Sequence, residues 1–148
     1  MSYIKRVNNE IDFLLNLNKY KVYIYQDDNI IDISVNYNNN YYNFKFDSSY
    51  PFKPPKEVKY NNIDYFTLVK ITSVIFIKLL TKMYGQKCLC CDSIMCGNTW
   101  NPLYKIMDII NEIDNIVKIK QSIIEKIYLD KIKLKYLISD INLDQYIY

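Results

Sequence analysis

Four cysteines lie within nine residues of this 148-residue chain, and their thiols are the side chains best suited to chemistry. They are Cys88, Cys90, Cys91 and Cys96. Such close spacing does not suit disulfides that join distant loops, so we expect reduced thiols. The chain has no histidine, which excludes mechanisms with an imidazole base and zinc sites with a histidine ligand. Any reaction in this segment therefore depends on thiol chemistry.

A zinc site is one hypothesis for the cysteines, with Cys88, Cys91 and Cys96 plus Cys90 as ligands. However, a site of four cysteines normally uses two separated pairs, and adjacent cysteines rarely reach one ion. We therefore predict no bound metal and no cofactor. The structural alternative is that Cys88, Cys90 and Cys96 are buried as small apolar residues.

The residues before this segment predict a helix followed by strands. Apolar residues recur at helical spacing over residues 3 to about 16. From residue 20 to residue 46 the apolar period is two, with two turns rich in Asp and Asn. This pattern predicts three antiparallel strands, and a short fourth strand fits residues 57–60.

All four prolines and both glycines lie between residues 51 and 102, which marks this stretch as one with special backbone geometry. It begins with a proline-rich loop over residues 50–55. Ser73 as N-cap and Gly85 at the C-terminus predict a helix over residues 74–84. Residues 65–71 fit either a strand or the start of that helix.

The last third of the chain is helical in pattern. One long pattern starts at Leu103, and another covers residues 123–146, with a break near Ser139 and Asp140. The order of elements predicts a single α+β domain over residues 1–148, with its helices segregated from an antiparallel sheet.

Composition limits the classes of partner. Half of the residues are hydrophobic, 24% are charged, and 16 Tyr and 6 Phe indicate a globular chain. The net charge is only +3 and single lysines alternate with apolar residues, so we do not expect nucleic acid as a partner. We expect no membrane span and a cytoplasmic protein. The Asn, Lys, Ile and Tyr bias is typical of AT-rich genomes, such as those of some protists and large DNA viruses; a viral protein would act in the host cytoplasm.

Two proline motifs flank the cysteine segment. Residues 50–55 read Tyr-Pro-Phe-Lys-Pro-Pro, and residues 100–102 read Trp-Asn-Pro. Together with the order of elements, these motifs resemble the ubiquitin-conjugating enzyme family over nearly the whole chain. The resemblance implies the UBC-like fold: an N-terminal helix, a four-stranded antiparallel meander, an extended active-site segment and C-terminal helices.

The resemblance also implies a function, that of a ubiquitin-conjugating (acyl) transferase. Such an enzyme accepts ubiquitin or a ubiquitin-like modifier from an activating enzyme as a cysteine thioester, and transfers it to lysine, with a ubiquitin ligase as partner. Cys91 is the implied nucleophile, since the following Asp-Ser-Ile-Met resembles the family's Leu-x-Ile-Leu and Trp100 lies nine residues on. Cys88, twelve residues before Trp100, is the alternative, and Cys90 fits neither register.

The chain departs from the family where the oxyanion of the transfer step is stabilised. The family's His-Pro-Asn is missing, and eight residues before Cys91 and Cys88 stand Met83 and Leu80, which cannot donate a hydrogen bond. Asn98 is the nearest amide that can substitute. One alternative function is therefore a catalytically inactive UBC-like binding module, and a second is a zinc-stabilised interaction domain.

Five further residues are candidates for roles in such an enzyme, Asp92 from its chemistry and the other four from the resemblance. Asp92 is a candidate to orient or deprotonate the incoming lysine, against a role as an exposed, solvated acid. The Lys5 and Arg6 pair on the first helix corresponds to basic residues that meet the activating enzyme. Phe52 and Pro102 resemble the two loop contacts with ligases, and core packing is the alternative for both.

Overall fold

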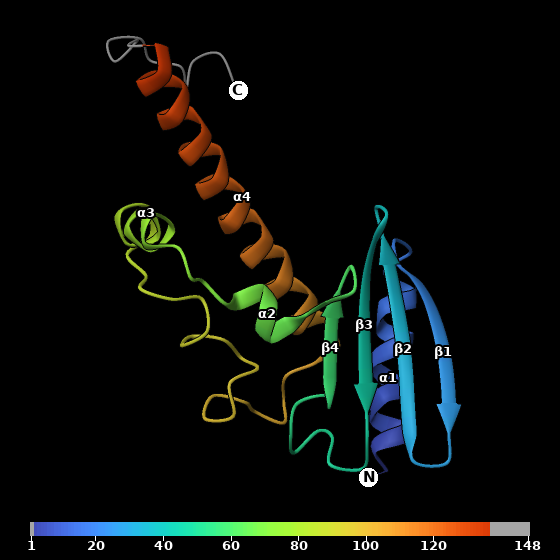
Figure 1. Ribbon diagram of the computed structural model, residues 1–148. Helices are drawn as coiled ribbons and strands as arrows, with labels where there is room; N and C mark the ends of the chain where they lie inside the picture. The colour runs from blue at the N-terminus through green and yellow to red at the C-terminus, as the bar shows by residue number, and fades with distance from the viewer. Residues whose placement is uncertain (1, 137–148) are drawn as a thin grey trace.

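The computed structural model describes residues 2–136, in which one helix covers a face of a sheet and a long helix extends away from it (Figure 1). The elements are α1 (Tyr3–Asn16), β1 (Lys21–Asp27), β2 (Ile30–Tyr37), β3 (Asn40–Phe46), β4 (Glu57–Tyr60), β5 (Ile63–Asp64), α2 (Tyr65–Val69), α3 (Val74–Tyr84) and α4 (Ile106–Tyr136). The predicted α+β class, the first helix and the antiparallel strands are confirmed.

The sheet contains five strands in the order β1-β2-β3-β4-β5, and every neighbouring pair is antiparallel. Four strands were predicted. The fifth follows a turn at Asn61 and Asn62, whose φ angles of 48° and 65° are left-handed. Asparagine tolerates this conformation, so the chain reverses at once after β4. Strand β5 has only two residues, too few to show an alternating pattern.

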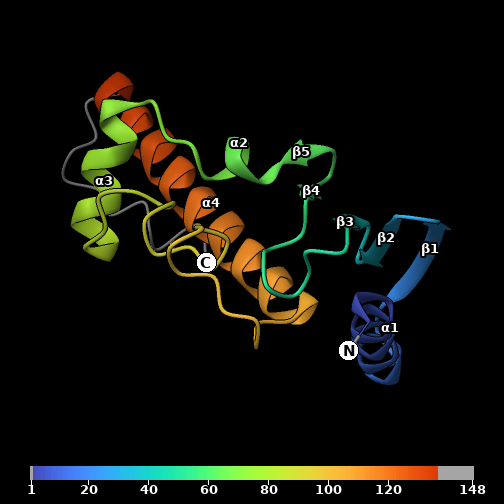
Figure 2. The same cartoon turned by 90° about the horizontal axis from the view of Figure 1, so that it is seen from below.

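One face of the sheet forms the core against α1, as Figure 2 shows. Alternate side chains of β2 and β3 are buried, and the register places Ile33 opposite Phe44. The buried face of α1 consists of Val7, Glu10, Ile11 and Leu14. Side chains on the other face of the edge strand β1 remain exposed, among them Tyr23 and Tyr25.

A buried carboxylate fixes α1 relative to the rest of the chain. Glu10 is only 5% exposed and accepts hydrogen bonds from Arg6, from the Tyr50 hydroxyl at 2.8 and 2.9 Å, and from the Ile106 backbone N–H at 2.8 Å. Ile106 is the first residue of α4, so the carboxylate lies at the positive end of that helix dipole. This contact joins α1, the proline-rich loop and α4.

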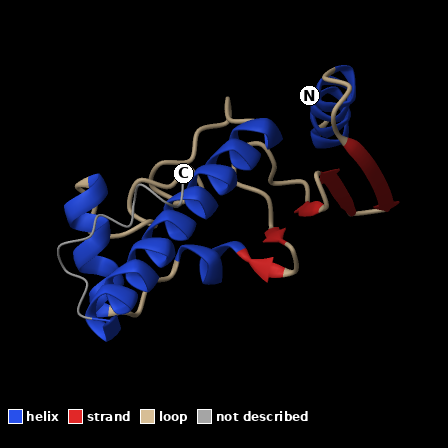
Figure 3. Cartoon of the chain, turned by 90° about the horizontal axis from the view of Figure 1, so that it is seen from above, coloured by secondary structure: helices blue, strands red, loops and turns tan. Residues whose placement is uncertain are grey.

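Capping residues define the ends of the helices that lie beyond the sheet. Helix α3 has the predicted bounds: the Ser73 hydroxyl accepts from the Phe76 N–H at 3.3 Å, and Gly85 closes the helix with φ 69°. Residues 65–69 form the short helix α2, capped by Asp64 and separate from α3, so they are neither a strand nor the start of α3. Helix α3 packs against α4, and Figure 3 shows both away from α1.

Helix α4 begins three residues after Leu103 and runs without a break to Tyr136. The later start has a local cause: the Asp108 carboxylate accepts from the Lys105 N–H at 2.8 Å, which makes Lys105 the residue that precedes the helix. The predicted break near Ser139 and Asp140 lies outside the described residues. No helix within residues 2–136 has the length and apolar character that crossing a membrane requires.

Candidate thiol site

The segment between α3 and α4 is a series of turns that presents the cysteines. The Ser93 N–H donates to the Cys90 carbonyl at 3.3 Å, and the Cys96 N–H donates to the Ser93 carbonyl at 3.1 Å. The Trp100 N–H then donates to the Cys96 carbonyl at 2.9 Å. The expectation of an extended segment is therefore wrong, because these backbone hydrogen bonds coil the chain repeatedly.

A buried serine anchors the segment just after the cysteines. Ser93 is 3% exposed, and its hydroxyl lies in hydrogen-bond contact with Tyr65 and 3.3 Å from Glu112. Glu112 also accepts from the Ile94 N–H and from the Tyr65 hydroxyl, both at 2.9 Å. Burial raises the pKa of the Tyr65 phenol, so it remains a donor at neutral pH. The network ties the segment to α2 and α4.

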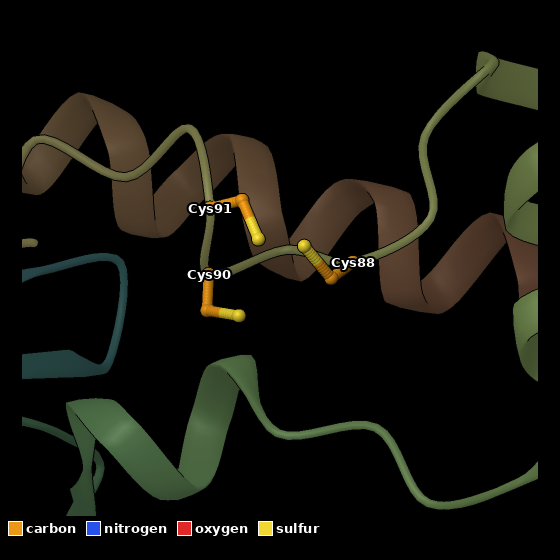
Figure 4. Close-up of side chains that lie close together, drawn as sticks. All are labelled: Cys88, Cys90 and Cys91. Carbon is orange, nitrogen blue, oxygen red and sulfur yellow. The ribbon is translucent and has the colours of Figure 1, made fainter.

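Three of the four thiols lie close together, and their residues lie shortly before Ser93 in the chain. The sulfur atoms of Cys88, Cys90 and Cys91 all lie within 4.8 Å of one another. In Figure 4 the sulfurs of Cys88 and Cys91 turn toward each other, and that of Cys90 turns to the same side. Cys90 and Cys91 are exposed and Cys88 is half-buried. The thiols are free, as predicted, and accessible to solvent.

This arrangement corrects two expectations about the cysteines. The adjacent residues Cys90 and Cys91 do direct their sulfurs to a common point, because the turn at residues 90–93 brings both side chains to the Cys88 side. Cys88, Cys90 and Cys96 are not buried as apolar residues. Cys96 lies outside the cluster of three sulfurs.

Hydrogen bonds within the cluster favour negative charge on one sulfur. The pKa of Cys88 is lowered, first by a hydrogen bond from the Cys91 thiol, then by the Cys91 backbone N–H and by the same groups of Cys90. The pKa of Cys91 is raised to about 12, because its thiol donates to Cys88 and Cys90 and a second anion would be repelled. A negative charge is therefore favoured on Cys88 over Cys91.

The other predicted catalytic residues lie near the cluster in sequence but are not hydrogen-bonded to it within residues 2–136. Asp92 and Asn98 are both exposed, and no hydrogen bond joins either side chain to the thiols in the part of the chain that the structure describes. Leu80 is fully buried, and Met83 is 43% exposed on α3. The positions that would hold the oxyanion donor by sequence count are thus apolar and lie on a helix.

The two proline motifs come together in space. The Trp100 indole N–H donates to the Pro51 carbonyl at 2.8 Å, and the Trp100 ring lies 6.2 Å from the Tyr50 ring between centroids. The Tyr50–Pro51 peptide bond is cis. Because Tyr50 is buried, it attaches this joined pair of loops to the core. The cysteine segment ends at this junction.

Apolar side chains project from both joined loops. Phe52 is 79% exposed and Pro102 is exposed, so neither packs in the core. Tyr50 is the residue of this loop that packs there. Leu103, which the sequence pattern placed at the start of the helix, is 77% exposed and precedes α4. These three residues, which we call the loop surface, are available to a partner.

Lys5 and Arg6, the basic pair on α1, have different surroundings. Lys5 is exposed. Arg6 donates to the carbonyls of Pro102 at 3.1 Å and Tyr104 at 3.0 Å, besides its ion pair with Glu10. Arg6 therefore holds the loop before α4 in place, and Lys5 is the member of the pair that remains accessible.

Comparison of the chain with protein-family models, with curated proteins and with solved structures finds no match. A functional assignment therefore depends on the residues and the geometry. Two residues of the site, Tyr65 and Glu112, were missed from the sequence, because both lie in patterns that predict ordinary helix or strand. Neither carries a local signal of its contact with Ser93.

Proposed function

We propose that the protein is a ubiquitin-conjugating enzyme-like acyl carrier. It accepts ubiquitin or a ubiquitin-like modifier as a thioester on Cys88 and transfers it to lysine. The observation that supports this proposal is a solvent-facing group of thiols in an anchored segment that ends where two family-like proline loops join. A thiol suits this reaction, because its thioester reacts with an amine without a metal or an organic cofactor.

The register of the sequence motif favours Cys91 as the nucleophile. The hydrogen bonding of the thiols favours Cys88 instead. The pKa of Cys88 is lowered, first by hydrogen bonding from Cys91 and then by that from Cys90, so a negative charge there is favoured. In the charging step the Cys88 thiolate attacks the carbonyl of the activating enzyme's thioester. A new S–C bond forms, the old one breaks, and the activating enzyme's thiolate leaves.

In the discharge step, as in charging, one bond to the acyl carbon forms and one breaks. A lysine amine attacks the thioester carbonyl, an N–C bond forms, and the S–C bond to Cys88 breaks. Cys88 leaves as a thiolate that the same donors stabilise, and the amine loses its proton to solvent or to the exposed carboxylate of Asp92. Asn98, on the exposed turn before Trp100, is the amide we assign to the oxyanion. Its exposure predicts slow discharge.

Two surfaces fit the partners of such a carrier. Lys5 on α1 is the accessible cation of the pair, and we assign it to the activating enzyme. The loop surface of Phe52, Pro102 and Leu103 is apolar and exposed, and we assign it to a ubiquitin ligase. Arg6 contributes to both indirectly, since it links α1 to the loop that carries Pro102.

A second candidate function is a catalytically inactive UBC-like binding module. One observation favours it: Leu80, at one position counted for the oxyanion donor, is fully buried in the core. Removal of an oxyanion donor typically costs about 10²- to 10³-fold in rate. A module of this kind would keep the loop surface and bind its partner without transferring a modifier.

A charging assay separates the two functions. The reduced, chelator-treated chain is incubated with ubiquitin, activating enzyme and ATP, and the products are resolved with and without reductant. The carrier gives an adduct that reductant removes, and Cys96→Ser, outside the cluster, gives the same adduct. No adduct in a folded wild-type chain, with any modifier supplied with its own activating enzyme, favours the binding module.

A further inference from the structure

We propose that Cys88, Cys90 and Cys91 form a binding site for one Zn²⁺ ion, held by three thiolates with one coordination position open. The site reverses the prediction of no metal that was made from cysteine spacing. It goes beyond the proposed function, because the carrier uses the metal-free thiols and the ion would occupy them. No carboxylate or histidine belongs to the cluster within residues 2–136.

The distances between the sulfur atoms fit this ion after a small adjustment. Tetrahedral zinc binds thiolate at about 2.3 Å, which places two ligand sulfurs about 3.8 Å apart. The three sulfurs already lie within 4.8 Å of one another, so each pair closes by about 1 Å or less. Cys90 and Cys91 are exposed and lie on a turn, so small rotations of their side chains achieve this change.

A backbone turn supports the cluster. The Ser93 N–H donates to the Cys90 carbonyl at 3.3 Å, so Cys90 and Cys91 lie within a hydrogen-bonded turn. This turn lies where the sulfurs of Cys90 and Cys91 approach that of Cys88 to within 4.8 Å. Ser93 is itself fixed by Glu112 on α4, so the site has a rigid support on one side.

The donor set selects the class of ion. Thiolates favour soft or borderline ions such as Zn²⁺ and Cu(I), whereas Mg²⁺ and Ca²⁺ require oxygen ligands. Three protein ligands leave the fourth position of tetrahedral zinc to water or to a ligand from a partner. Binding displaces the thiol protons into solvent, so uptake of the ion is accompanied by release of protons. While the ion is bound, Cys88 is unable to form a thioester.

The test is a zinc titration of the full-length, reduced, metal-free chain in competition with a chromophoric chelator. We expect one Zn²⁺ per chain. Cys90→Ser should weaken binding at least tenfold, because it replaces one of the three sulfur ligands. Cys96→Ser is the matched control and should bind as the wild type does. Cys90 is exposed, so its variant should keep the fold, which circular dichroism verifies.

Several results would overturn the site. These are no retained zinc after gel filtration, half an ion per chain from an ion shared by two copies, or equal affinity in Cys90→Ser and wild type. Cu(I) is titrated in parallel, and binding of Cu(I) without Zn²⁺ would overturn the choice of ion. The titration contains no activating enzyme, and chelator treatment removes zinc from the chain before the charging assay, so each proposal fails on its own measurement.

Discussion

Cys88 and Cys91 are separated by two residues, yet their hydrogen bonds give the two sulfurs opposite tendencies to lose a proton. Donors converge on Cys88, whereas Cys91 is itself a donor. This difference belongs to the turn and not to residue type, since four identical side chains in the segment have different surroundings. Only the position of each sulfur relative to the backbone N–H groups distinguishes them.

Alkylation should therefore label Cys88 before Cys91 in the metal-free chain at neutral pH. The lowered pKa of Cys88 gives it a larger thiolate fraction than an ordinary cysteine at the same pH, and this fraction falls as the pH drops through that pKa. The pKa of about 12 keeps Cys91 protonated across the same range. Iodoacetamide labelling with peptide mapping gives both rates as a function of pH.

The source of the difference is tested by removing the donor thiol. Cys91→Ala should slow alkylation of Cys88 at neutral pH, and Cys96→Ala should leave the rate unchanged. Faster labelling of Cys91 than of Cys88 in the wild type would contradict the assigned position of the thiolate.

At the scale of elements, helix α4 supports the thiol segment through Glu112. Its carboxylate receives the Ile94 N–H and the Tyr65 hydroxyl, which lie on two different segments. Glu112→Ala leaves these donors and Ser93 without their acceptor. The turns should then open more often, although α4 itself remains folded.

We predict that Glu112→Ala increases hydrogen exchange at the amides of Ile94 and Met95 by at least about tenfold, which equals about 1.4 kcal/mol of lost protection. Asn111→Ala, an exposed neighbour on the same helix, is the matched control. Unchanged protection at both amides would show that the segment does not depend on this contact.

The elements were predictable to the extent that their signals are local. The change of apolar period at residue 20 predicts the start of the sheet. Ser73 and Gly85 predict the two ends of α3, because capping residues act within one helical turn. Strand β5 and the turns of the thiol segment were missed. Both depend on backbone hydrogen bonds whose partners no periodic pattern reveals.

At the scale of the whole molecule, Glu10 is the contact on which the relative positions of the parts depend. It joins α1, the proline-rich loop through Tyr50, and the first turn of α4 through Ile106. The sequence places Glu10 on a helix but gives no sign that it is buried, because its partners lie 40 and 96 residues away. The convergence of three sulfurs escaped prediction for the same reason: spacing does not give direction.

Glu10→Ala should lower the free energy of unfolding by about 3 kcal/mol, since it removes the carboxylate partner of Arg6 and leaves the Tyr50 hydroxyl and a helix N–H without an acceptor. Urea denaturation followed by circular dichroism measures the change. Asn9→Ala, at an exposed position beside it, should change stability by less than about 0.5 kcal/mol. A loss below about 1 kcal/mol for Glu10→Ala would mean that the junction is not central to the fold.

Charging of cysteine variants with ubiquitin tests the central claim most directly. Wild type, Cys91→Ser and Cys96→Ser, each shown to be folded and freed of zinc beforehand, should form an adduct that reductant removes. Cys88→Ser should form none, or only an oxyester that resists reductant. A thioester that persists in Cys88→Ser and disappears in Cys91→Ser would contradict the assignment to Cys88, and no adduct in any folded chain, wild type included, would contradict acyl transfer itself.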